Sequence, residues 1–344
     1  MQKPERLSYD FAEIRAHIAR LPRVKLIERP TPLTEAEHLA RVLCPQGGPR
    51  IFIKRDDLTS LGLGGNKLRN LEFRLARTMA DNPDTVIVGL DVQSNSARQT
   101  VAACNKLGLK TILVLEGRKP NVIQGNLLMD YLLGADVRFA SNPREQRQML
   151  DDIAAQVRKA GGRPHILNDN PMFDIASAAA YLETTLEVLE QLGDIGLKPS
   201  CFYMSSSGKG AAGIILAQRL TGLGFAMHGV TATSEFHLPS RTAGIANDTA
   251  RALGLDLVVT QEEVVNFDNF VGAGYGIPSP AGNEAVKLFA RTEGVILDPI
   301  YTGKAAAGMV AHLREGPLRP RRRSCLRSYR RHTGQFHLVR FVAG

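Results

Sequence analysis

The sequence of 344 residues contains no tryptophan, and aromatic residues make up only 6% of it. Its four cysteines are scattered without a Cys-x-x-Cys pair, and its histidines lack ligand spacing, which argues against a disulfide framework and a metal site. No apolar run approaches the roughly 20 residues of a membrane-spanning helix. The first 23 residues carry charges throughout, so no secretory signal is predicted. We therefore expect a cytoplasmic protein that contacts no membrane.

Acidic residues are absent from residues 317–344, which contain eight arginines and no lysine. The whole chain has 43 basic and 34 acidic residues, so this segment carries almost all of the net charge of +9. The rest of the chain is nearly neutral and contains no recognisable nucleic-acid-binding module, which argues against a nucleic-acid partner. A basic arm that binds polyanions is the alternative for residues 317–344.

Short apolar runs alternate with longer helical patterns along most of the chain. The predicted strands are residues 85–89, 111–115, 136–139, 165–167, 201–204 and 228–233. The predicted helices are residues 95–107, 126–133, 144–160, 176–192, 211–220, 282–291 and 303–314. This alternation is typical of open parallel sheets with flanking helices, so the predicted fold class is α/β. Because the pattern breaks near residues 60 and 170, we expect a large domain of residues 1–60 and 172–344, with a small domain of residues 61–171 inserted in it.

A lysine follows paired glycines in the segment Gly64-Gly65-Asn66-Lys67. The glycines permit unusual backbone angles, and Lys67 lies in the first turn of an apparent helix. Cations are disfavoured near a helix N-terminus, which makes a purely structural lysine an odd choice there. A lysine held close to a ligand suits Schiff-base chemistry. The alternative is a surface lysine after a glycine turn.

Ser94 and Asn95 lie between a predicted strand and a predicted helix. The carboxyl end of such a strand is where open α/β sheets bind ligands. Both side chains, assisted by the N–H groups of the helix start, can donate hydrogen bonds to a carboxylate or a phenolic oxygen. The alternative is an ordinary helix cap, since Ser and Asn are favoured capping residues.

Another strand–helix junction contains the loop Ser205-Ser206-Ser207-Gly208-Lys209-Gly210. Hydroxyls and N–H groups at a helix start form a phosphate site. Residues 208–213 also spell Gly-x-Gly-x-x-Gly, and Glu235 lies at about the spacing of a ribose-binding acid. An NAD-dependent oxidoreductase is therefore the alternative, although it leaves the three serines and the Gly-Gly-Asn-Lys segment unexplained.

Two tyrosines occur at positions that suit a flat ligand. Tyr275 lies in the glycine-rich loop 272–278, and Tyr301 lies where a predicted strand ends and a helix begins. The ring of Tyr301 can stack on a flat ring, and Tyr275 can reach the same place. Ordinary packing is the alternative for both.

Taken together, these segments closely resemble the family of D-cysteine desulfhydrases and 1-aminocyclopropane-1-carboxylate (ACC) deaminases. The similarity runs from about residue 30 to residue 316. Its markers are Ile53 to Asp57, Gly64 to Arg69, Gln93 to Asn95 with Arg98-Gln99, Gly274 to Pro278, and Asp298 to Lys304. The resemblance implies the tryptophan-synthase β-subunit fold (fold type II), with two open parallel-sheet domains and pyridoxal 5'-phosphate (PLP) in the cleft between them. It also implies a homodimer, and it makes the large domain the PLP-binding one.

The resemblance further implies a role for each candidate residue. Lys67 would carry PLP as a Schiff base and shuttle protons, and Asn95 would contact the ring hydroxyl. Ser94 would hold the carboxylate of a small amino-acid substrate, Tyr301 would stack on or near the ring, and Tyr275 would face the substrate. The other cofactor-binding residues would be Ser206, Ser207, Gly208, Lys209 and Gly210 at the phosphate, together with Thr302 and Thr333.

The residue after Tyr301 favours one activity within the family. ACC deaminases typically have glutamate there and desulfhydrases typically have threonine, and this chain has Thr302. A neutral hydroxyl implies a weaker electron sink than a carboxylate, which suits the loss of a good leaving group from the β-carbon. We therefore expect β-elimination as in D-cysteine desulfhydrases, with pyruvate, ammonia and sulfide as products. ACC deamination is the alternative.

The chain departs from the family pattern at three places. Ser96 replaces the usual histidine, and Lys209 lies in a phosphate loop that usually reads Gly-Ser-Gly-Gly-Thr. An extra cation would suit an acidic substrate, so an L-cysteate sulfo-lyase is a further alternative. The third departure is the arginine-rich segment 319–331, which replaces an apolar strand before His332-Thr333-Gly334.

A strand made mostly of arginine would bury charge at a high cost in free energy. We therefore expect residues 321–331 not to form an ordered strand, and we interpret this stretch as a departure from an ancestral reading frame. If the altered end damages the site, the chain would be a relic that keeps the fold without catalysing.

Overall fold

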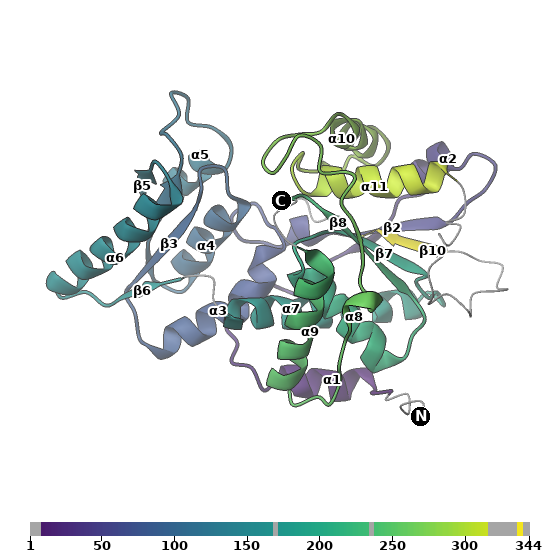
Figure 1. Cartoon of the computed structure of the whole chain (residues 1–344), viewed down its shortest axis with the longest axis horizontal. Coiled ribbons are helices and arrows are strands. Elements are labelled where there is room, and N and C mark those ends of the chain that lie inside the picture. The colour runs from purple at the N-terminus through teal and green to yellow at the C-terminus, as the bar shows by residue number, and fades with distance from the viewer. Residues whose placement is uncertain (1–7, 168–170, 234–236, 316–335, 340–344) are drawn as a thin grey trace. The chain divides into compact units, whose positions relative to one another are not determined.

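The computed structural model describes residues 8–167, 171–233, 237–315 and 336–339. The chain divides into two compact units, each with its own sheet (Figure 1). The first unit contains Met1–His17, Pro30–Asp56 and Tyr181–Gly344, and the second contains Ile18–Arg29 and Asp57–Ala180. Residues 18–29 thus lie in the second unit, whereas the sequence pattern assigned them to the large domain.

One buried carboxylate ties residues 18–29 to the second unit. Glu72, which is fully buried on α3 (Lys67–Ala80), accepts hydrogen bonds from the backbone N–H groups of Leu26 and Ile27 at 2.8 and 3.1 Å. It also forms ion pairs with Arg23 and Arg29. A buried carboxylate needs such partners, and no local sequence pattern reveals that they come from so far along the chain.

The sheet of the second unit has four parallel strands in the order β5-β4-β3-β6. The strands are Thr85–Asp91 (β3), Lys110–Glu116 (β4), Asp136–Ala140 (β5) and Pro164–Ile166 (β6). Successive residues of β3 face opposite sides, because Val86 and Val88 belong to one core cluster and Ile87 belongs to another. Strands that are apolar on both faces are typical of a parallel sheet covered on both sides.

Helices cover both faces of this sheet. The helices α4 (Asn95–Lys106) and α5 (Gly125–Leu132) pack together with α3 on the side of Val86 and Val88. The helix α6 (Pro143–Lys159), which runs beside β3 in Figure 1, packs on the side of Ile87. It contributes Leu150 and Ile153 to the core cluster there. The carboxyl end of β3 and the start of α4 are therefore held by packing on both faces.

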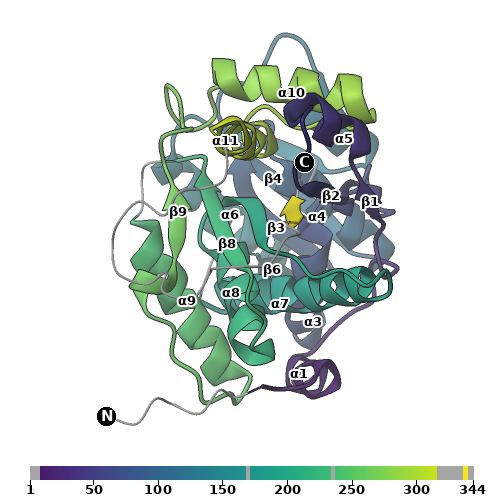
Figure 2. The same cartoon turned by 90° about the vertical axis from the view of Figure 1, so that its right-hand side faces the viewer.

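The sheet of the first unit has six strands in the order β1-β2-β10-β7-β8-β9. Its edge strands β1 and β9 lie at opposite sides of Figure 2. The strands are Leu33–Glu35 (β1), Arg50–Lys54 (β2), Cys201–Ser206 (β7), Ala226–Thr231 (β8), Val265–Phe267 (β9) and Phe336–Val339 (β10). All neighbours are parallel except β1, which pairs antiparallel with β2 at the edge. The predicted α/β class with open parallel sheets is confirmed apart from this edge strand.

The central strand β10 was not predicted from the sequence. It follows the His332-Thr333-Gly334 segment and pairs in parallel with both β2 and β7, so that Leu338 lies opposite Phe52 and Phe202. Phe, Leu and Val suit a strand, but a run of four residues after an arginine-rich segment gives a weak signal. The predictions about residues 319–331 and Thr333 fall outside the described residues.

The remaining helices cover the sheet of the first unit and its flanks. They are α1 (Phe11–Ile18), α2 (Glu37–Leu43), α7 (Pro171–Gly193), α8 (Lys209–Thr221), α9 (Leu238–Ala252), α10 (Pro280–Glu293) and α11 (Thr302–Arg314). The helix α7 begins in the second unit and belongs to the first from Tyr181 onward. On one face, Tyr203 of β7 joins a core cluster with Met309 of α11. On the other, Met204 of the same strand approaches Gly210 of α8, so helices cover both sides (Figure 1).

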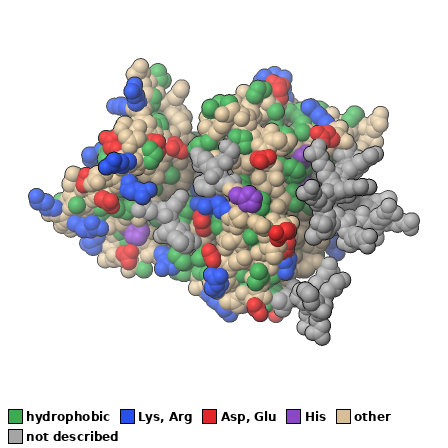
Figure 3. Space-filling view, in the orientation of Figure 1, with side chains coloured by type: hydrophobic (Ala, Val, Ile, Leu, Met, Phe, Trp, Pro, Cys, Tyr) green, Lys and Arg blue, Asp and Glu red, His purple; other side chains and the backbone are tan. Residues whose placement is uncertain are grey.

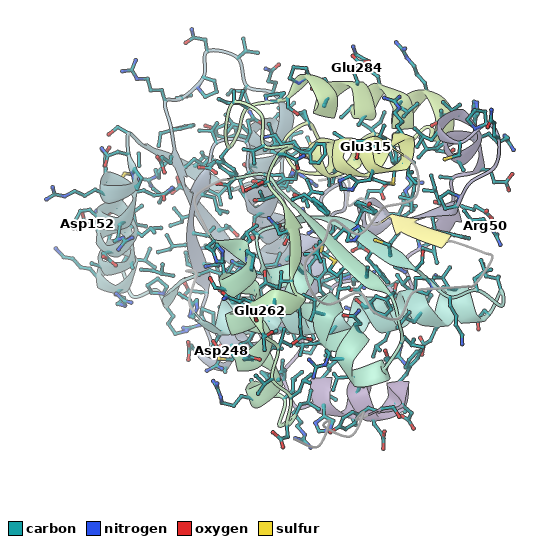
Figure 4. All side chains as sticks on the ribbon, turned by 45° about the vertical axis from the view of Figure 1, so that its right-hand side comes forward. Arg50, Asp152, Asp248, Glu262, Glu284 and Glu315 are labelled. Atoms are coloured by element: carbon teal, nitrogen blue, oxygen red, sulfur yellow. The ribbon has the colours of Figure 1, made fainter. Side chains whose placement is uncertain are left out.

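Exposed charges of both signs lie on the outer helices. Asp152 on α6, Asp248 on α9 and Glu284 on α10 point away from the helices that carry them (Figure 4). On the face shown in Figure 3, the Lys and Arg side chains are intermixed with Asp and Glu side chains. Among the residues that the structure describes, no helix is long and apolar enough to cross a membrane.

The strands and helices predicted between residues 85 and 314 are all present, within a few residues of their predicted limits. The short strand β9 and the helix α9 were not predicted. The helix α9 contains Gly244, Asn247 and Asp248, which are weak helix formers, and it is stabilised by packing against α8. Packing against a neighbouring helix thus stabilises a helix that the local sequence does not clearly predict.

Candidate active site

Lys67 is the first residue of α3 and follows a loop whose backbone favours glycine. Gly64 and Gly65 have φ angles of +74° and +135°. A Cβ atom on Gly64 would overlap the carbonyl oxygen of Asp57, and one on Gly65 would lie 2.6 Å from Oε1 of Gln99. Glycine is therefore required at both positions for two reasons: the φ angle is positive, and neighbouring atoms leave no space for a Cβ atom.

Buried side chains hold this loop in place. Thr59 Oγ1 accepts a hydrogen bond from the N–H of Gly65 at 2.8 Å and lies 3.1 Å from its carbonyl oxygen, to which it donates. Gln99 Oε1 accepts from the N–H of Leu68 at 3.3 Å, and Gln99 Nε2 donates to the carbonyl oxygen of Asn95 at 3.0 Å. One buried amide thus ties the residue after Lys67 to the first residue of α4. The structure brings the starts of α3 and α4 together.

The side chain of Asn95 is oriented by other residues of the second unit. Asn95 Oδ1 accepts from Asn126 Nδ2 at 2.8 Å, and Asn126 Oδ1 accepts from Arg98 Nε at 2.8 Å. Arg98 is only 3% exposed and also donates from Nη1 to the carbonyl oxygen of Gly64 at 3.0 Å. Arg98 therefore contacts both the loop before Lys67 and the residue that holds Asn95.

Ser94 is the N-cap of α4. Its Oγ accepts from the N–H groups of Ser96 and Ala97 at 3.1 and 3.3 Å. The capping alternative is therefore correct for Ser94. Both bonds use the oxygen as acceptor, however, so the hydroxyl proton can still be donated to a ligand.

A fully buried carboxyl group lies near Arg98. Neither carboxyl oxygen of Asp130 on α5 has a hydrogen-bond partner in the described part of the chain. Burial raises the pKa of Asp130 to about 7, and the charge of Arg98 opposes this rise. The folded protein therefore keeps this proton at pH values where the unfolded chain, with the ordinary value of 3.8, has lost it.

Asp130 is expected to make the free energy of unfolding fall as the pH rises from about 4 to about 7. The native state binds more protons than the unfolded state in this range. The stabilisation that comes from protonating Asp130 is therefore complete below the unfolded pKa and is lost as the pH rises through the folded pKa. Between pH 4.5 and 8, the free energy of unfolding of the wild type should fall relative to that of Asp130→Asn by about 2–4 kcal/mol. Urea unfolding at a series of pH values measures it.

Asp136→Asn is the matched control for this experiment. Hydrogen bonding to Arg138 lowers the pKa of Asp136, so its linkage has the opposite sign. The free energy of unfolding of the wild type should rise slightly relative to that of this variant as the pH rises through the range where the carboxyl ionises. A pH-independent difference for Asp130→Asn would contradict the interpretation of Asp130.

The serine–glycine loop begins α8 in the first unit, at the carboxyl end of β7. Gly208 has a φ of +99°, and its N–H donates to Ser206 Oγ at 3.2 Å. Arg241 Nε on α9 donates to the carbonyl oxygen of Ser207 at 3.1 Å. Lys209 is the first residue of α8, and the first-turn N–H groups of a helix lack acceptors within the helix. The loop is therefore suited to binding an anion.

A buried hydroxyl without a partner lies beside this loop. Thr242 on α9 is 1% exposed, and its Oγ1 has no hydrogen-bond partner among the described residues. A Cβ atom at Gly208 would lie 3.4 Å from this oxygen. Buried polar groups are nearly always hydrogen-bonded, so Thr242 is a candidate to contact whatever the loop binds. Sequence reasoning missed Thr242 because no motif links α9 to the loop.

The structure brings Tyr275 and Tyr301 together in the first unit. Their hydroxyl oxygens are 2.6 Å apart, and their ring centroids are 6.1 Å apart. Lys304, which is fully buried on α11, donates from Nζ to the carbonyl oxygen of Gly274 at 2.9 Å and so anchors the loop that carries Tyr275. Burial lowers the pKa of Lys304, and the charge of Asp298 opposes this.

Thr302 is held by Asp298 at the start of α11. Thr302 Oγ1 accepts from the N–H of Asp298 at 2.8 Å and donates to Asp298 Oδ2 at 2.6 Å. Asp298 Oδ1 accepts from the N–H groups of Ile300 and Tyr301 at 3.0 and 2.6 Å. Because its proton is committed to a carboxylate, the Thr302 hydroxyl can offer a further ligand only an acceptor. Asp298 was a marker of the resemblance, but its action on Thr302 was not predicted.

Two predicted functional residues lie outside the described residues. They are Thr333, expected at the cofactor, and Glu235, the ribose-binding acid of the NAD alternative. Conversely, Thr59, Arg98, Gln99 and Asn126 lie in the second unit's hydrogen-bond network without having been assigned roles. Gln99 could have been found from its spacing, since it follows Asn95 by one helical turn.

Comparison with known proteins identifies the family. The sequence model described as "Pyridoxal-phosphate dependent enzyme" matches residues 24–326. A D-cysteine desulfhydrase of Klebsiella pneumoniae is 35% identical over 301 residues, which cover 86% of this chain and 89% of that protein. A D-cysteine desulfhydrase of Salmonella paratyphi C is 34% identical over 299 residues, with the same coverage.

Solved structures agree with this assignment. The crystal structure of an ACC deaminase homologue matches with a TM-score of 0.80 at 28% identity, covering 97% of this chain and 95% of that one. Threonine deaminase isoform 2 from Solanum lycopersicum shares the fold, with a TM-score of 0.62 at 17% identity over 99% of this chain and 86% of that one. The predicted fold type II is thus confirmed, and the dinucleotide alternative is not supported. The chain belongs to the family of pyridoxal-phosphate dependent enzymes that includes the D-cysteine desulfhydrases.

Proposed function

We propose that this chain is a lyase that removes the β-substituent and the amino group of a small amino acid, with D-cysteine as the first candidate. The observation that carries the proposal is the setting of Lys67, which a glycine loop held by Thr59, Arg98 and Gln99 presents at a helix start. The relatives named D-cysteine desulfhydrase support the substrate class. With D-cysteine, the reaction consumes water and yields pyruvate, ammonia and hydrogen sulfide.

The residues of the first unit fit the phosphate of PLP. A phosphate accepts hydrogen bonds, and this loop offers the first-turn N–H groups of α8 and the cation of Lys209. The buried Thr242 Oγ1 has no partner among the described residues and would gain one from a phosphate oxygen. We assign phosphate binding to Ser206, Ser207, Gly208, Lys209, Gly210 and Thr242.

The polar residues proposed for the ring have complementary roles. Asn95 Nδ2 is a donor suited to the ring oxygen, because Asn95 Oδ1 is occupied by Asn126. Thr302 can only accept, because its proton is donated to Asp298. An acceptor backed by a carboxylate favours a protonated ring nitrogen. The electron sink would therefore be stronger than a neutral hydroxyl alone implies.

When bound, PLP stabilises negative charge at the α-carbon of the substrate. Lys67 Nζ would hold the cofactor as a Schiff base and then move the α-proton, and Ser94 would donate its hydroxyl proton to the substrate carboxylate. One of the hydroxyls of Tyr275 and Tyr301, whose oxygens are 2.6 Å apart, donates to the other, and one of them can deliver its proton to the departing thiolate. Tyr301 would also contact the ring.

The proposed substrate has two alternatives within the family. ACC deamination is the activity suggested by the ACC deaminase homologue that matches at 28% identity. L-Cysteate remains the candidate for an acidic substrate, because Lys209 adds a cation to the loop at the start of α8. Pyruvate formation from D-cysteine, or L-cysteate, or the corresponding product from ACC, distinguishes the three activities.

The visible absorption spectrum of the purified protein tests the proposal. A yellow protein whose colour is lost on borohydride reduction, with the pyridoxyl group mapped by peptide analysis to Lys67, is the expected result. Formation of pyruvate from D-cysteine or L-cysteate, or of the four-carbon 2-oxo acid from ACC, then identifies the substrate. A protein that stays colourless with added PLP would overturn the catalytic proposal.

Three further expectations rest on the resemblance and the composition. A homodimer is expected from the family and is tested by light scattering. A cytoplasmic location is expected from the scattered cysteines. We also propose that the first unit corresponds to the large PLP-binding domain and the second to the small domain inserted in it.

A further inference from the structure

The second unit contains a chain of three polar side chains that ends at Asn95. Arg98 Nε donates to Asn126 Oδ1 at 2.8 Å, and Asn126 Nδ2 donates to Asn95 Oδ1 at 2.8 Å. Asn126 Nδ2 also donates to the carbonyl oxygen of Gln93 at 2.8 Å. None of the comparisons and none of the sequence motifs assigns a role to Asn126.

Arg98 decides which group donates and which accepts in each of these hydrogen bonds. A guanidinium group can only donate hydrogen bonds, so the amide oxygen of Asn126 must face it. Both protons of the Asn126 amide are then used, one by Asn95 and one by Gln93. The oxygen of Asn95 is therefore occupied, and its NH₂ group is the part that can be donated to a ligand.

Amide orientation matters because the two ends of an asparagine have opposite polarity. A donor stabilises a deprotonated ring oxygen, whereas an amide oxygen in the same place would repel it. Arg98 is 3% exposed, and it also donates to the carbonyl oxygen of Gly64 in the loop before Lys67. The same guanidinium thus sets the backbone near Lys67 and the polarity of Asn95.

We propose that Asn126 is a positioning residue which, fixed by Arg98, turns the amide NH₂ group of Asn95 toward the ring oxygen of PLP. The inference rests on the proposed function, because it assumes that PLP binds at Lys67 and Asn95. Asn126 itself does not touch the cofactor. Its effect is to keep the ring oxygen deprotonated and to hold the cofactor more tightly.

The variant Asn126→Asp tests this role. It keeps an acceptor for Arg98 Nε and should strengthen that contact, so the fold is expected to survive. The second carboxylate oxygen would face Asn95 Oδ1 and the carbonyl oxygen of Gln93. The backbone carbonyl cannot become a donor, so the Asn95 amide is the group that reverses. We expect the Kd for PLP to rise about tenfold, as the loss of one charge-assisted hydrogen bond implies. We also expect the pH midpoint of the bound cofactor's absorbance change to rise by about one pH unit.

Asn105→Asp is the matched control. Asn105 is exposed on the same helix as Arg98 and donates from Nδ2 to the carbonyl oxygen of Leu133 at 2.7 Å. This variant makes the same chemical change at a residue that takes no part in the hydrogen bonds from Arg98 to Asn95. It should leave the Kd for PLP and the absorbance midpoint unchanged, and a shift equal to that of Asn126→Asp would overturn the proposal.

Two further measurements keep the failures distinguishable. If Asn126→Asp does not fold, Asn126→Ala should give a smaller shift in the same direction, and wild-type values for that variant would overturn the positioning role. A wild type that carries PLP on Lys67 while Asn126→Asp has the same Kd and midpoint would overturn this role alone. A wild type that binds no PLP would overturn the proposed function and this inference together.

Discussion

Replacing Lys67 with alanine is expected to lower kcat/KM for the elimination by about 10⁴-fold, because the group that binds the cofactor covalently and moves the α-proton is lost. The loop should keep its conformation in this variant. Thr59, Arg98 and Gln99 hold it through backbone atoms of residues 64, 65 and 68. The loss would therefore report on chemistry and not on folding.

Three measurements check this expectation. The variant should show no borohydride-fixed pyridoxyl group, its melting temperature should stay close to that of the wild type, and pyruvate formation should be near background. Lys106→Ala, which removes an exposed lysine at the end of α4, is the control and should retain both the label and the activity. Activity of Lys67→Ala within tenfold of the wild type would show that another residue moves the proton.

Replacing Gly64 with alanine is expected to destabilise the protein by at least about 3 kcal/mol, because backbone strain and a steric clash add. The φ of Gly64 is +74°, which favours glycine. A Cβ atom there would overlap the carbonyl oxygen of Asp57 and lie 2.7 Å from that of Thr59. These are backbone atoms, so neither can move aside without shifting the loop that leads to Lys67.

Gly108→Ala separates the two causes. Gly108 has the same φ of +74°, but no atom of the described part of the chain lies within 4 Å of the position its Cβ would take. The strain alone should cost about 1 kcal/mol. Urea unfolding gives both values, and titration with PLP should show weaker binding only for Gly64→Ala. Equal destabilisation by the two variants would mean that the loop relaxes without resistance.

The sequence predicted much of the fold because the relevant signals are local. Apolar runs such as residues 85–89 and 111–115 are strands with residues on both faces buried, and this pattern is visible in the sequence. The order of strands in the sheets was not visible. The central place of β10, which pairs with β2 and β7 from far along the chain, depends on contacts between distant segments.

In the candidate site, too, local sequence patterns predicted the residues, and the tertiary structure was needed for the contacts between them. Lys67, Ser94 and Asn95 were identified from glycine and capping patterns at strand–helix junctions, and Tyr275 and Tyr301 from their places in loops. That the two tyrosine hydroxyls lie 2.6 Å apart required the tertiary structure. So did the finding that Ser94 caps α4 while keeping a proton to donate.

By itself, the sequence determined the α/β class and the residue types available for chemistry, because periodicity, glycine placement and helix capping act over a few residues. Only the tertiary structure decided what each polar group is bonded to. It gave Glu72 partners from residues 23–29, turned Asn95 through Asn126, and buried Thr242 Oγ1 where no other described residue bonds to it. The physical reason is that a hydrogen bond or a buried charge depends on which distant residue folding brings within about 3 Å, and no local pattern carries that information.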